Sequence, residues 1–234
     1  MTLEELTLQV ERLQAAQACR NLMGRYAYYH TAFRHKDYMT LWAERDDSYF
    51  KFPFGCYVGI DAIRHCYLVE HGDRADPGMD EKMQGIMTMH QLDTEVLEVA
   101  ADGRTAKGVW ISPGHETFLR APEGVENPTA EEKKADPMWA WSKYEVEFIR
   151  ENGQWKLWHM VLYPLFKTSY YKAWTDSEEV TEKAINEEAA KDKPAAPPFW
   201  QWSKTAIYPA DEPEPPVPYD TVENMPHKII VPEK

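Results

Sequence analysis

The sequence lacks the patterns that mark membrane proteins and nucleic-acid-binding proteins. No apolar stretch approaches the length needed to span a bilayer, and the first residues show no basic segment followed by an apolar run. We therefore expect no transmembrane helix and no signal peptide, and we expect a cytoplasmic protein. Basic residues are few, 26 against 39 acidic ones, which gives a formal charge of −13. Nucleic acids and anionic membranes both need a basic face, so neither is an expected partner.

Cysteine is scarce, and the motifs of metal and cofactor sites are missing. Cys19, Cys56 and Cys66 are far apart and form no CxxC pair, which favours a reducing compartment over a disulfide framework or a zinc site. Histidines do not occur at HxH, HxxxH or HExxH spacing, so no metal is expected. The glycines form neither GxGxxG nor GxxxxGKS/T, so no nucleotide cofactor is expected. GxSxG is also missing, which disfavours covalent catalysis.

Aromatic residues are abundant instead, at 13% of the chain with 9 Trp and 13 Tyr. Four ring-bearing side chains, Tyr26, Tyr29, His30 and Phe33, share one face of a predicted helix because their spacing is i, i+3, i+4 and i+7. Two phenols and an imidazole need hydrogen-bond partners if they are buried. They either lie half-buried with their polar tips in water, or they line a cavity and perform acid–base chemistry there.

Helices and strands follow in an order that indicates an α+β protein. Thr2 and Glu5 form a capping-box pattern that begins a long helix at about residue 3. Asp37 is the expected N-cap of a short second helix, and a third helix is expected over 60–68. Charged loops are expected over 73–82 and 120–137. Alternating and aromatic residues predict strands over 48–52, 86–99, 105–119, 139–149 and 155–166.

The character of the sequence changes after residue 167. A short charged helix is expected over 177–190, and the prolines that follow forbid a packed sheet or helix. Trp and Tyr are interleaved with these prolines, which is unusual for a disordered tail. We therefore divide the chain into a domain over 1–167 and an extension over 168–234 that lies extended across the domain or across a neighbouring subunit.

Five short segments carry a resemblance to a known family. They are Arg25-Tyr26, Asp37-Tyr38, Gly59-Ile60-Asp61-Ala62-Ile63, Met89-His90 and Asn152-Gly153-Gln154-Trp155-Lys156-Leu157. In order and spacing the chain resembles the SnoaL-like branch of the nuclear transport factor 2 superfamily, over about residues 10–167. The resemblance implies a cone-shaped α+β fold, in which a curved, mostly antiparallel sheet wraps around helices and encloses an apolar pocket.

The resemblance also implies a class of chemistry. Many members are lyases and related enzymes without cofactors, and scytalone dehydratase and the bile-acid dehydratases use a pocket Tyr, His and Asp. Tyr26 and His90 fall at the positions of that tyrosine and histidine. The aspartate would fall near Thr31, which cannot act as a carboxylate, so His30 and Arg34 are the candidates to replace it.

A second pocket acid of the family would fall near Gly114, with His115 and Glu116 beside it. The resulting hypothesis makes His90 the general base and Tyr26 the hydrogen-bond donor to the substrate, with His30 and Arg34 as its anchor. A single histidine entering a strand is nevertheless more often structural than catalytic.

Substrate contacts are expected from two further groups of residues. The helix face contributes Tyr29 and Phe33. The strands contribute Tyr49, Lys51, Trp110, Trp141, Lys143 and His159. Periodicity places His159 opposite Met160 and Leu162, but it does not say which of these two faces lines the pocket. The remaining histidines are expected at the surface: His35, His65, His71 and His227.

Taken together, these features predict a cofactor-independent, dehydratase-like lyase that acts on an aromatic, phenolic or polycyclic small molecule. The leaving group could be water or a small aldehyde such as formaldehyde. An isomerase or cyclase with the same pocket is the first alternative, and a non-catalytic binding or accessory subunit is the second. We expect a homo-oligomer, either a dimer or a trimer.

Overall fold

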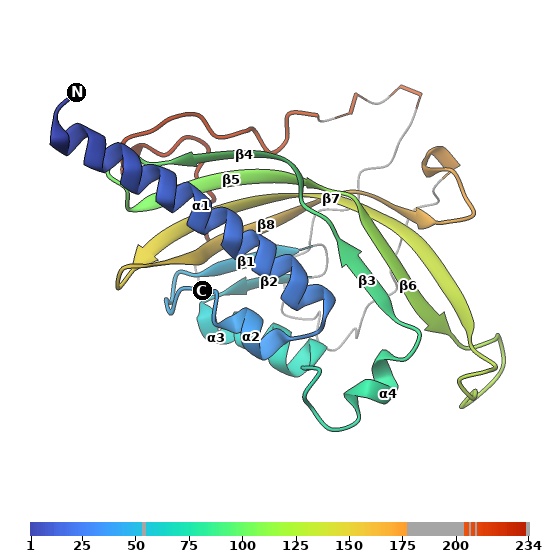
Figure 1. The fold of residues 1–234 in the computed structure, drawn as a ribbon. Coiled ribbons are helices and arrows are strands. Elements are labelled where there is room, and N and C mark those ends of the chain that lie inside the picture. Colours follow the sequence, from blue (N-terminus) through green and yellow to red (C-terminus); the bar gives the residue numbers. More distant parts are fainter. Residues whose placement is uncertain (53–54, 177–203, 206, 209, 233–234) are drawn as a thin grey trace.

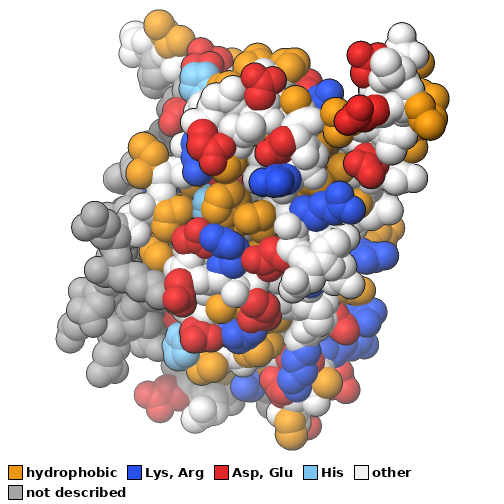
Figure 2. All heavy atoms as spheres, turned by 90° about the vertical axis from the view of Figure 1, so that its left-hand side faces the viewer, with side chains coloured by type: hydrophobic (Ala, Val, Ile, Leu, Met, Phe, Trp, Pro, Cys, Tyr) orange, Lys and Arg blue, Asp and Glu red, His pale blue; other side chains and the backbone are white. Residues whose placement is uncertain are grey.

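The computed structural model describes residues 1–52, 55–176, 204–205, 207–208 and 210–232. It consists of a single curved sheet with helices on one face and the C-terminal tail on the other (Figure 1). On the face shown in Figure 2, acidic and basic side chains of the described residues are intermixed. No helix among the described residues is long and apolar enough to cross a bilayer.

The long helix α1 spans Leu3–Thr31 and begins with the capping box that the sequence predicts. The Glu5 amide donates to the Thr2 hydroxyl, and the Thr2 amide donates back to the Glu5 carboxylate. Only the second half of the helix has a buried face, which consists of Ala15, Cys19, Leu22, Met23 and Tyr26. The first half therefore extends past the core, and apolar side chains there, such as Leu3 and Leu13, are exposed.

Short helices close the open end of the sheet below α1 (Figure 1). They are α2 (His35–Met39), α3 (Ile60–Arg64), the π-helix η1 (His65–His71) and α4 (Met79–Met83). Two single 3-10 turns, η2 (Trp174–Asp176) and η3 (Val222–Asn224), lie in the C-terminal extension.

Eight strands form the sheet in the order β2-β1-β8-β7-β5-β4, with β6 pairing with both β7 and β3. Their bounds are β1 Tyr49–Phe52, β2 Gly55–Val58, β3 Met87–His90, β4 Asp93–Val99, β5 Thr105–Ser112, β6 Gly114–Arg120, β7 Lys134–Glu151 and β8 Gln154–Ser169. All pairs are antiparallel except β1 with β8. This confirms the α+β cone with a mostly antiparallel curved sheet.

The sheet curves because β7 changes partner along its length. β5 pairs with the Ser142–Ile149 part of β7, and β6 pairs with the Lys134–Trp139 part. Pro113 separates β5 from β6, since proline has no amide hydrogen to donate to a ladder. A register shift between β7 and β8 falls at Trp141/Ser142, where the partner changes.

Several boundaries differ from those that the sequence predicts. The second helix begins at His35 rather than after Asp37, and α4 lies within the expected loop over 73–82. The expected strand over 86–99 is divided into β3 and β4, and that over 105–119 into β5 and β6, because each half pairs with a different neighbour. β2 was not expected. The helix expected over 177–190 lies outside the described residues.

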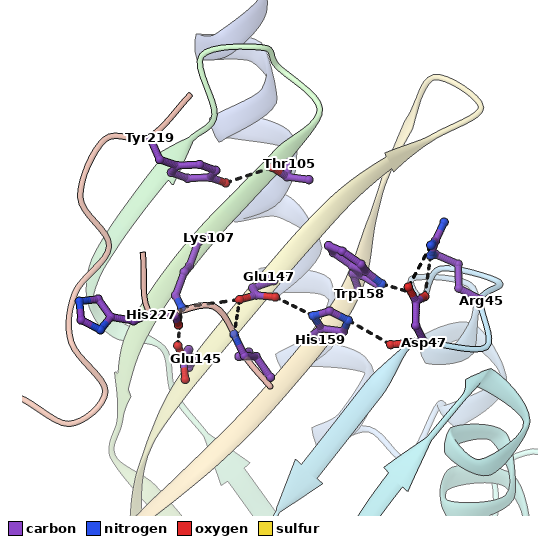
Figure 3. A network of polar contacts seen from close by, with 11 residues as sticks. Arg45, Asp47, Thr105, Lys107, Glu145, Glu147, Trp158, His159, Tyr219 and His227 are labelled. Carbon is purple, nitrogen blue, oxygen red and sulfur yellow. Dashed lines mark hydrogen bonds and ion pairs between the residues drawn. The ribbon is translucent and has the colours of Figure 1, made fainter. Parts of the chain in front are cut away.

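The face of the sheet that is opposite to α1 carries a buried ionic network (Figure 3). Lys107 Nζ lies 2.6 Å from Glu145 Oε1 and 3.6 Å from Glu147 Oε1, and it also donates to the His227 carbonyl of the tail. The Ile229 amide donates to Glu147 Oε1 at 2.6 Å. The described part of the tail is therefore bound to this chain's own sheet by charged groups.

The same network continues along β8 to the loop before β1. His159 lies between two acceptors, with Nδ1 2.6 Å from Glu147 Oε2 and Nε2 3.0 Å from the Asp47 carbonyl. Glu147 and His159 are 0% and 2% exposed. Burying these groups is tolerable because each polar atom of the network has a partner.

Replacing Lys107 by methionine tests this network. The substitution leaves Glu145 and Glu147 buried without their ammonium partner, so we expect the free energy of unfolding to fall by about 3–5 kcal/mol. Denaturant unfolding measures the change. The matched control is Lys133→Met, because Lys133 is exposed in the loop between β6 and β7. Equal stability of the two variants would show that the network contributes nothing.

Candidate functional site

Three rings from distant parts of the chain meet on the helix side of the sheet, and we call them the ring array: Tyr26, His30 and His90. The His30 ring lies 5.7 Å from the Tyr26 ring and 5.7 Å from the His90 ring, at interplanar angles of 5° and 23°. Tyr26 and His30 share one face of α1, as their spacing predicts, and His90 ends β3. The structure therefore brings together the two residues at the centre of the sequence hypothesis, with His30 in contact with both.

Tyr26 is 1% exposed and is held by a second phenol from the sheet. Its hydroxyl lies 2.9 Å from that of Tyr144 on β7. Burial, together with the nearby hydroxyls of Tyr144 and Tyr38, raises the pKa of Tyr26 well above its ordinary value. Tyr26 is therefore a neutral hydrogen-bonding group at every physiological pH.

His90 has a carboxylate beside it. Glu116 on β6 places Oε1 3.6 Å from His90 Nε2, and the two side chains keep 12% and 15% of their surface exposed. Glu116 Oε2 in turn lies 3.0 Å from Lys167 Nζ. Burial lowers the pKa of His90, the Glu116 charge opposes this, and Lys167 and His115 add to the lowering. His90 is therefore a neutral imidazole, hence a proton acceptor, at neutral pH.

His30 is surrounded by three other histidines. Burial lowers its pKa well below the ordinary value, and the neighbouring His90, His35 and His71 lower it further. His30 Nδ1 lies 3.4 Å from Nε2 of His35, whose Nδ1 lies 2.5 Å from the Gly72 carbonyl. The expectation that His35 is at the surface is wrong, because it is 0% exposed and its ring is hydrogen-bonded to the end of η1.

The other candidates on α1 lie at the edge of the ring array. Arg34 faces solvent, with its side chain 52% exposed, paired with Asp37 at 2.7 Å and placed over the Tyr29 ring at 4.8 Å. Phe33 has a positive φ of 54° and packs 5.7 Å from the His35 ring. Thr31 is exposed. Of the two candidates to replace the family aspartate, the structure places only His30 in the ring array.

Most of the strand candidates lie on the opposite side of the sheet, because successive side chains of a strand point to opposite faces. Phe50 and Met160 pack in the core with Tyr26, so their neighbours face the tail instead. Tyr49 packs against Ile229, Lys143 donates to the carbonyls of Ala210 and Glu212, and His159 belongs to the ionic network. Trp141 stacks on Phe166 at 5.6 Å.

Tyr49 and Lys51 line a separate pocket of about 350 Å³ between the sheet and the tail, together with Tyr163 and Ile229. Trp110 is on the helix face, where its Nε1 donates to Glu95 at 3.2 Å. Tyr49, Lys51, Lys143 and His159, which were expected as substrate contacts, therefore lie on the opposite side of the sheet from the ring array.

Sequence patterns contain little sign of the residues that complete the interior. Tyr38 and Tyr67 lie 4.3 Å apart between ring centroids, and His71 stacks on Tyr67 at 5.3 Å. His35 follows Arg34 and precedes Lys36, a polar run that is typical of surface. Tyr144 could have been found, because it alternates with the buried Val146 and Phe148. Among the described residues, no group of His, Cys, Asp or Glu is arranged to hold a metal ion.

This arrangement of an aromatic interior within a curved sheet agrees with a comparison of the sequence with protein families. A model of the SnoaL-like domain matches residues 11–161, which is more than half of the chain. The chain belongs to the SnoaL-like domain family. The resemblance noted from the sequence is thereby confirmed. No curated protein sequence matches this SnoaL-like chain.

Solved structures similar to this SnoaL-like domain share little sequence with it. A protein of Novosphingobium aromaticivorans DSM 12444 that is provisionally named a scytalone dehydratase has a TM-score of 0.49 and 16% identity, covering 70% of this chain and 93% of its own. The hexachlorocyclohexane dehydrochlorinase LinA-type3 from Novosphingobium barchaimii LL02 has a TM-score of 0.46 and 16% identity, covering 70% of this chain and 96% of its own.

Gly114, near which the family's second acid was expected, is required for the close approach of β6 to β7 beside His90. A Cβ added there would overlap the Ala140 carbonyl oxygen and would lie 2.9 Å from His90 Nδ1. By contrast, a Cβ added at Gly24 in α1 would meet nothing within 4 Å. The two glycines therefore differ in what an added methyl group would do.

We expect Gly114→Ala to destabilise the SnoaL-like domain by about 1–3 kcal/mol, because the methyl group overpacks the strand pair. We expect Gly24→Ala to stabilise it by about 0.5–1 kcal/mol, because alanine loses less backbone entropy within a helix. Denaturant unfolding of the two variants measures both effects. The same sign for both would contradict the close approach at His90.

Proposed function

We propose that this chain is a cofactor-independent lyase that eliminates water or a small aldehyde from an aromatic, phenolic or polycyclic small molecule. The observation that carries the proposal is the contact of Tyr26, His30 and His90 within an aromatic interior, with Glu116 beside His90. Membership of the SnoaL-like family supports a proposal of this class.

His90 serves as the general base in this proposal. Its pKa is lowered by burial, so the imidazole is free to take a proton at neutral pH, and the imidazolium that forms is stabilised by Glu116. The electron pair left on the substrate forms a new double bond as the bond from carbon to the leaving oxygen breaks. The imidazolium then returns its proton to that oxygen, and the hydroxyl group leaves as water. For loss of an aldehyde, His90 instead takes the proton of a substrate O–H, the O–H electron pair becomes the aldehyde C=O bond, the adjoining C–C bond breaks, and the carbanion that remains takes the proton back from the imidazolium.

Tyr26 serves as the hydrogen-bond donor to the substrate oxygen. In this proposal the Tyr144 hydroxyl donates to the Tyr26 oxygen, which leaves the Tyr26 O–H to be directed at the substrate. A neutral donor suits this role, because burial keeps the Tyr26 pKa high and the hydroxyl protonated. Donors that are fixed before the reaction stabilise negative charge developing on oxygen.

An aromatic substrate fits the composition of the interior. The Tyr38 ring lies 5.3 Å from Tyr26 and the Tyr67 ring 5.9 Å from His30, with Phe50 packed against Tyr67. Aromatic pairs favour stacked or edge-to-face contact with a further ring. Apolar walls with a few convergent polar groups are typical of small-molecule sites.

A panel of phenolic carbinols and steroids tests the proposal, incubated with purified protein without added cofactor and followed by ultraviolet absorbance for new conjugation. With a substrate found, His90→Gln is expected to lower kcat/KM by about 10²–10⁴-fold, because a general base is lost. Tyr26→Phe is expected to lower kcat by about 10²–10³-fold, as for other oxyanion donors.

The matched control is His65→Gln, because His65 has a 60% exposed side chain on the same end of the molecule. Near-ultraviolet circular dichroism checks that each variant is folded. A flat absorbance trace alongside tight ligand binding would support a binding protein instead. Rearranged product without loss of a group would support the isomerase or cyclase alternative.

The pH dependence of kcat/KM gives a second test, because it reports the pKa of the free enzyme's base. His90 accepts a proton only when neutral, so activity is lost as the pH falls through its pKa. Burial lowers that pKa, so the loss is expected below the ordinary histidine range of about 6.5. Tyr26 causes no loss at moderately alkaline pH, since its pKa is raised.

Two substitutions are expected to move this acidic limb in opposite directions. Glu116→Gln removes the charge that raises the His90 pKa, so the limb shifts to lower pH. Lys167→Met removes a charge that lowers it, so the limb shifts to higher pH. The other groups that face His90 are His30 and His115, which stay in place. Shifts in the same direction, or none, would show that His90 is not the titrating base.

A further inference from the structure

We propose that His35 is a positioning residue: its hydrogen bond to Gly72 fixes the tautomer of His30, which leaves Nε2 of His30 unprotonated as a second proton acceptor beside His90. The catalytic use of His30 rests on the proposed function, whereas the tautomer itself does not. His35 has no role in the sequence hypothesis, and none of the family positions falls on it.

The backbone carbonyl of Gly72, at the end of η1, determines which nitrogen of His35 carries the hydrogen. Gly72 ends this helix with φ of 77°, a left-handed conformation that favours glycine, and its oxygen lies 2.5 Å from His35 Nδ1. A carbonyl oxygen only accepts hydrogen bonds, so Nδ1 of His35 must carry the hydrogen.

The other nitrogen of His35, Nε2, is a hydrogen-bond acceptor because His35 is neutral. His35 is 0% exposed, and burial lowers its pKa, although the bond to Gly72 opposes this. A neutral imidazole carries one hydrogen, so Nε2 of His35 is a bare acceptor. His30 Nδ1 lies 3.4 Å from that nitrogen and is the atom that must supply the hydrogen.

The other nitrogen of His30, Nε2, is left without a hydrogen. Because His30 is also neutral, a hydrogen on Nδ1 leaves Nε2 with only its lone pair. Nε2 makes no hydrogen bond to a residue within the described ranges, and His30 keeps part of its surface exposed. The chain from Gly72 through His35 to His30 therefore leaves an unprotonated nitrogen in the His30 ring, whose centroid lies 5.7 Å from that of the His90 ring.

Nuclear magnetic resonance of the full chain with isotope-labelled histidine tests the tautomer directly, through long-range proton–nitrogen correlations at neutral pH. The His30 signals are identified by their loss in His30→Gln. We expect the wild-type spectrum to show His30 and His35 both protonated at Nδ1. A wild-type His30 protonated at Nε2 would overturn the proposal. The measurement needs no substrate, so it is independent of whether a lyase activity is found.

Variants of His35 test the cause. His35→Phe removes the acceptor, so His30 is expected to populate the Nε2–H tautomer. His35→Gln is expected to restore the Nδ1–H tautomer, because its amide can donate to Gly72 and accept from His30. The control is His71→Phe: His71 Nδ1 bonds the Cys66 carbonyl at 2.8 Å, so His30 should keep its tautomer. An unchanged His30 tautomer in folded His35→Phe would overturn the proposal.

Turnover gives a second readout once a substrate is known. His35→Phe should lower kcat by at least about tenfold with little change in KM, as expected for a misprotonated acid–base group, and His35→Gln should recover most of the loss. A correct tautomer with unaffected turnover would show that His35 positions His30 but that His30 takes no part in the reaction. If the wild-type protein proves to have no lyase activity, the nuclear magnetic resonance measurement still decides whether His35 sets the tautomer of His30.

Discussion

Strand β7 places successive side chains on opposite faces of the sheet, and both polar networks of the molecule depend on this alternation. Tyr144 points toward α1 and bonds Tyr26, whereas its neighbour Glu145 points toward the tail and bonds Lys107. A shift of one residue in the register would exchange the two faces and bury carboxylates among the rings. The long pairing of β7 with β8, which continues past both register shifts, holds this alternation in place.

The interior on the helix side of the sheet is made mostly of rings, so it favours the uncharged forms of its titratable side chains. Burial raises the pKa of Tyr26 and lowers those of His30 and His90, so all three are uncharged at neutral pH. The Glu116 carboxylate is mostly buried, with 12% of its side chain exposed, and it is tolerated there because Lys167 pairs with it. Such an interior favours proton transfer, because a neutral imidazole accepts a proton and a nearby charge stabilises the product.

Local signals in the sequence were sufficient for the capping box at Thr2 and the hairpin at Asn152-Gly153, since each depends on neighbouring residues, but not for β2 or α4. The family pattern singled out Tyr26 and His90, and in the structure both of their rings lie next to the His30 ring. Which strand face lines the interior could not be predicted, because a period of two fits either face. The partner of His35 lies 37 residues away in the chain, and no local pattern encodes that contact.

Lysines in aromatic strands show why the face matters for function. Lys143 lies between large rings in the sequence, which suits a pocket cation, yet its ammonium group donates to the Ala210 and Glu212 carbonyls of the tail at 2.8 and 2.6 Å. A proline-rich segment lacks many of the amide hydrogens that a sheet edge needs, so backbone carbonyls supply several of its hydrogen bonds to the sheet. Lysines on the sheet supply the donors, and Lys107 does the same for His227. Lys107, Lys143 and Glu147 on the outer face therefore all bond backbone groups of the extension.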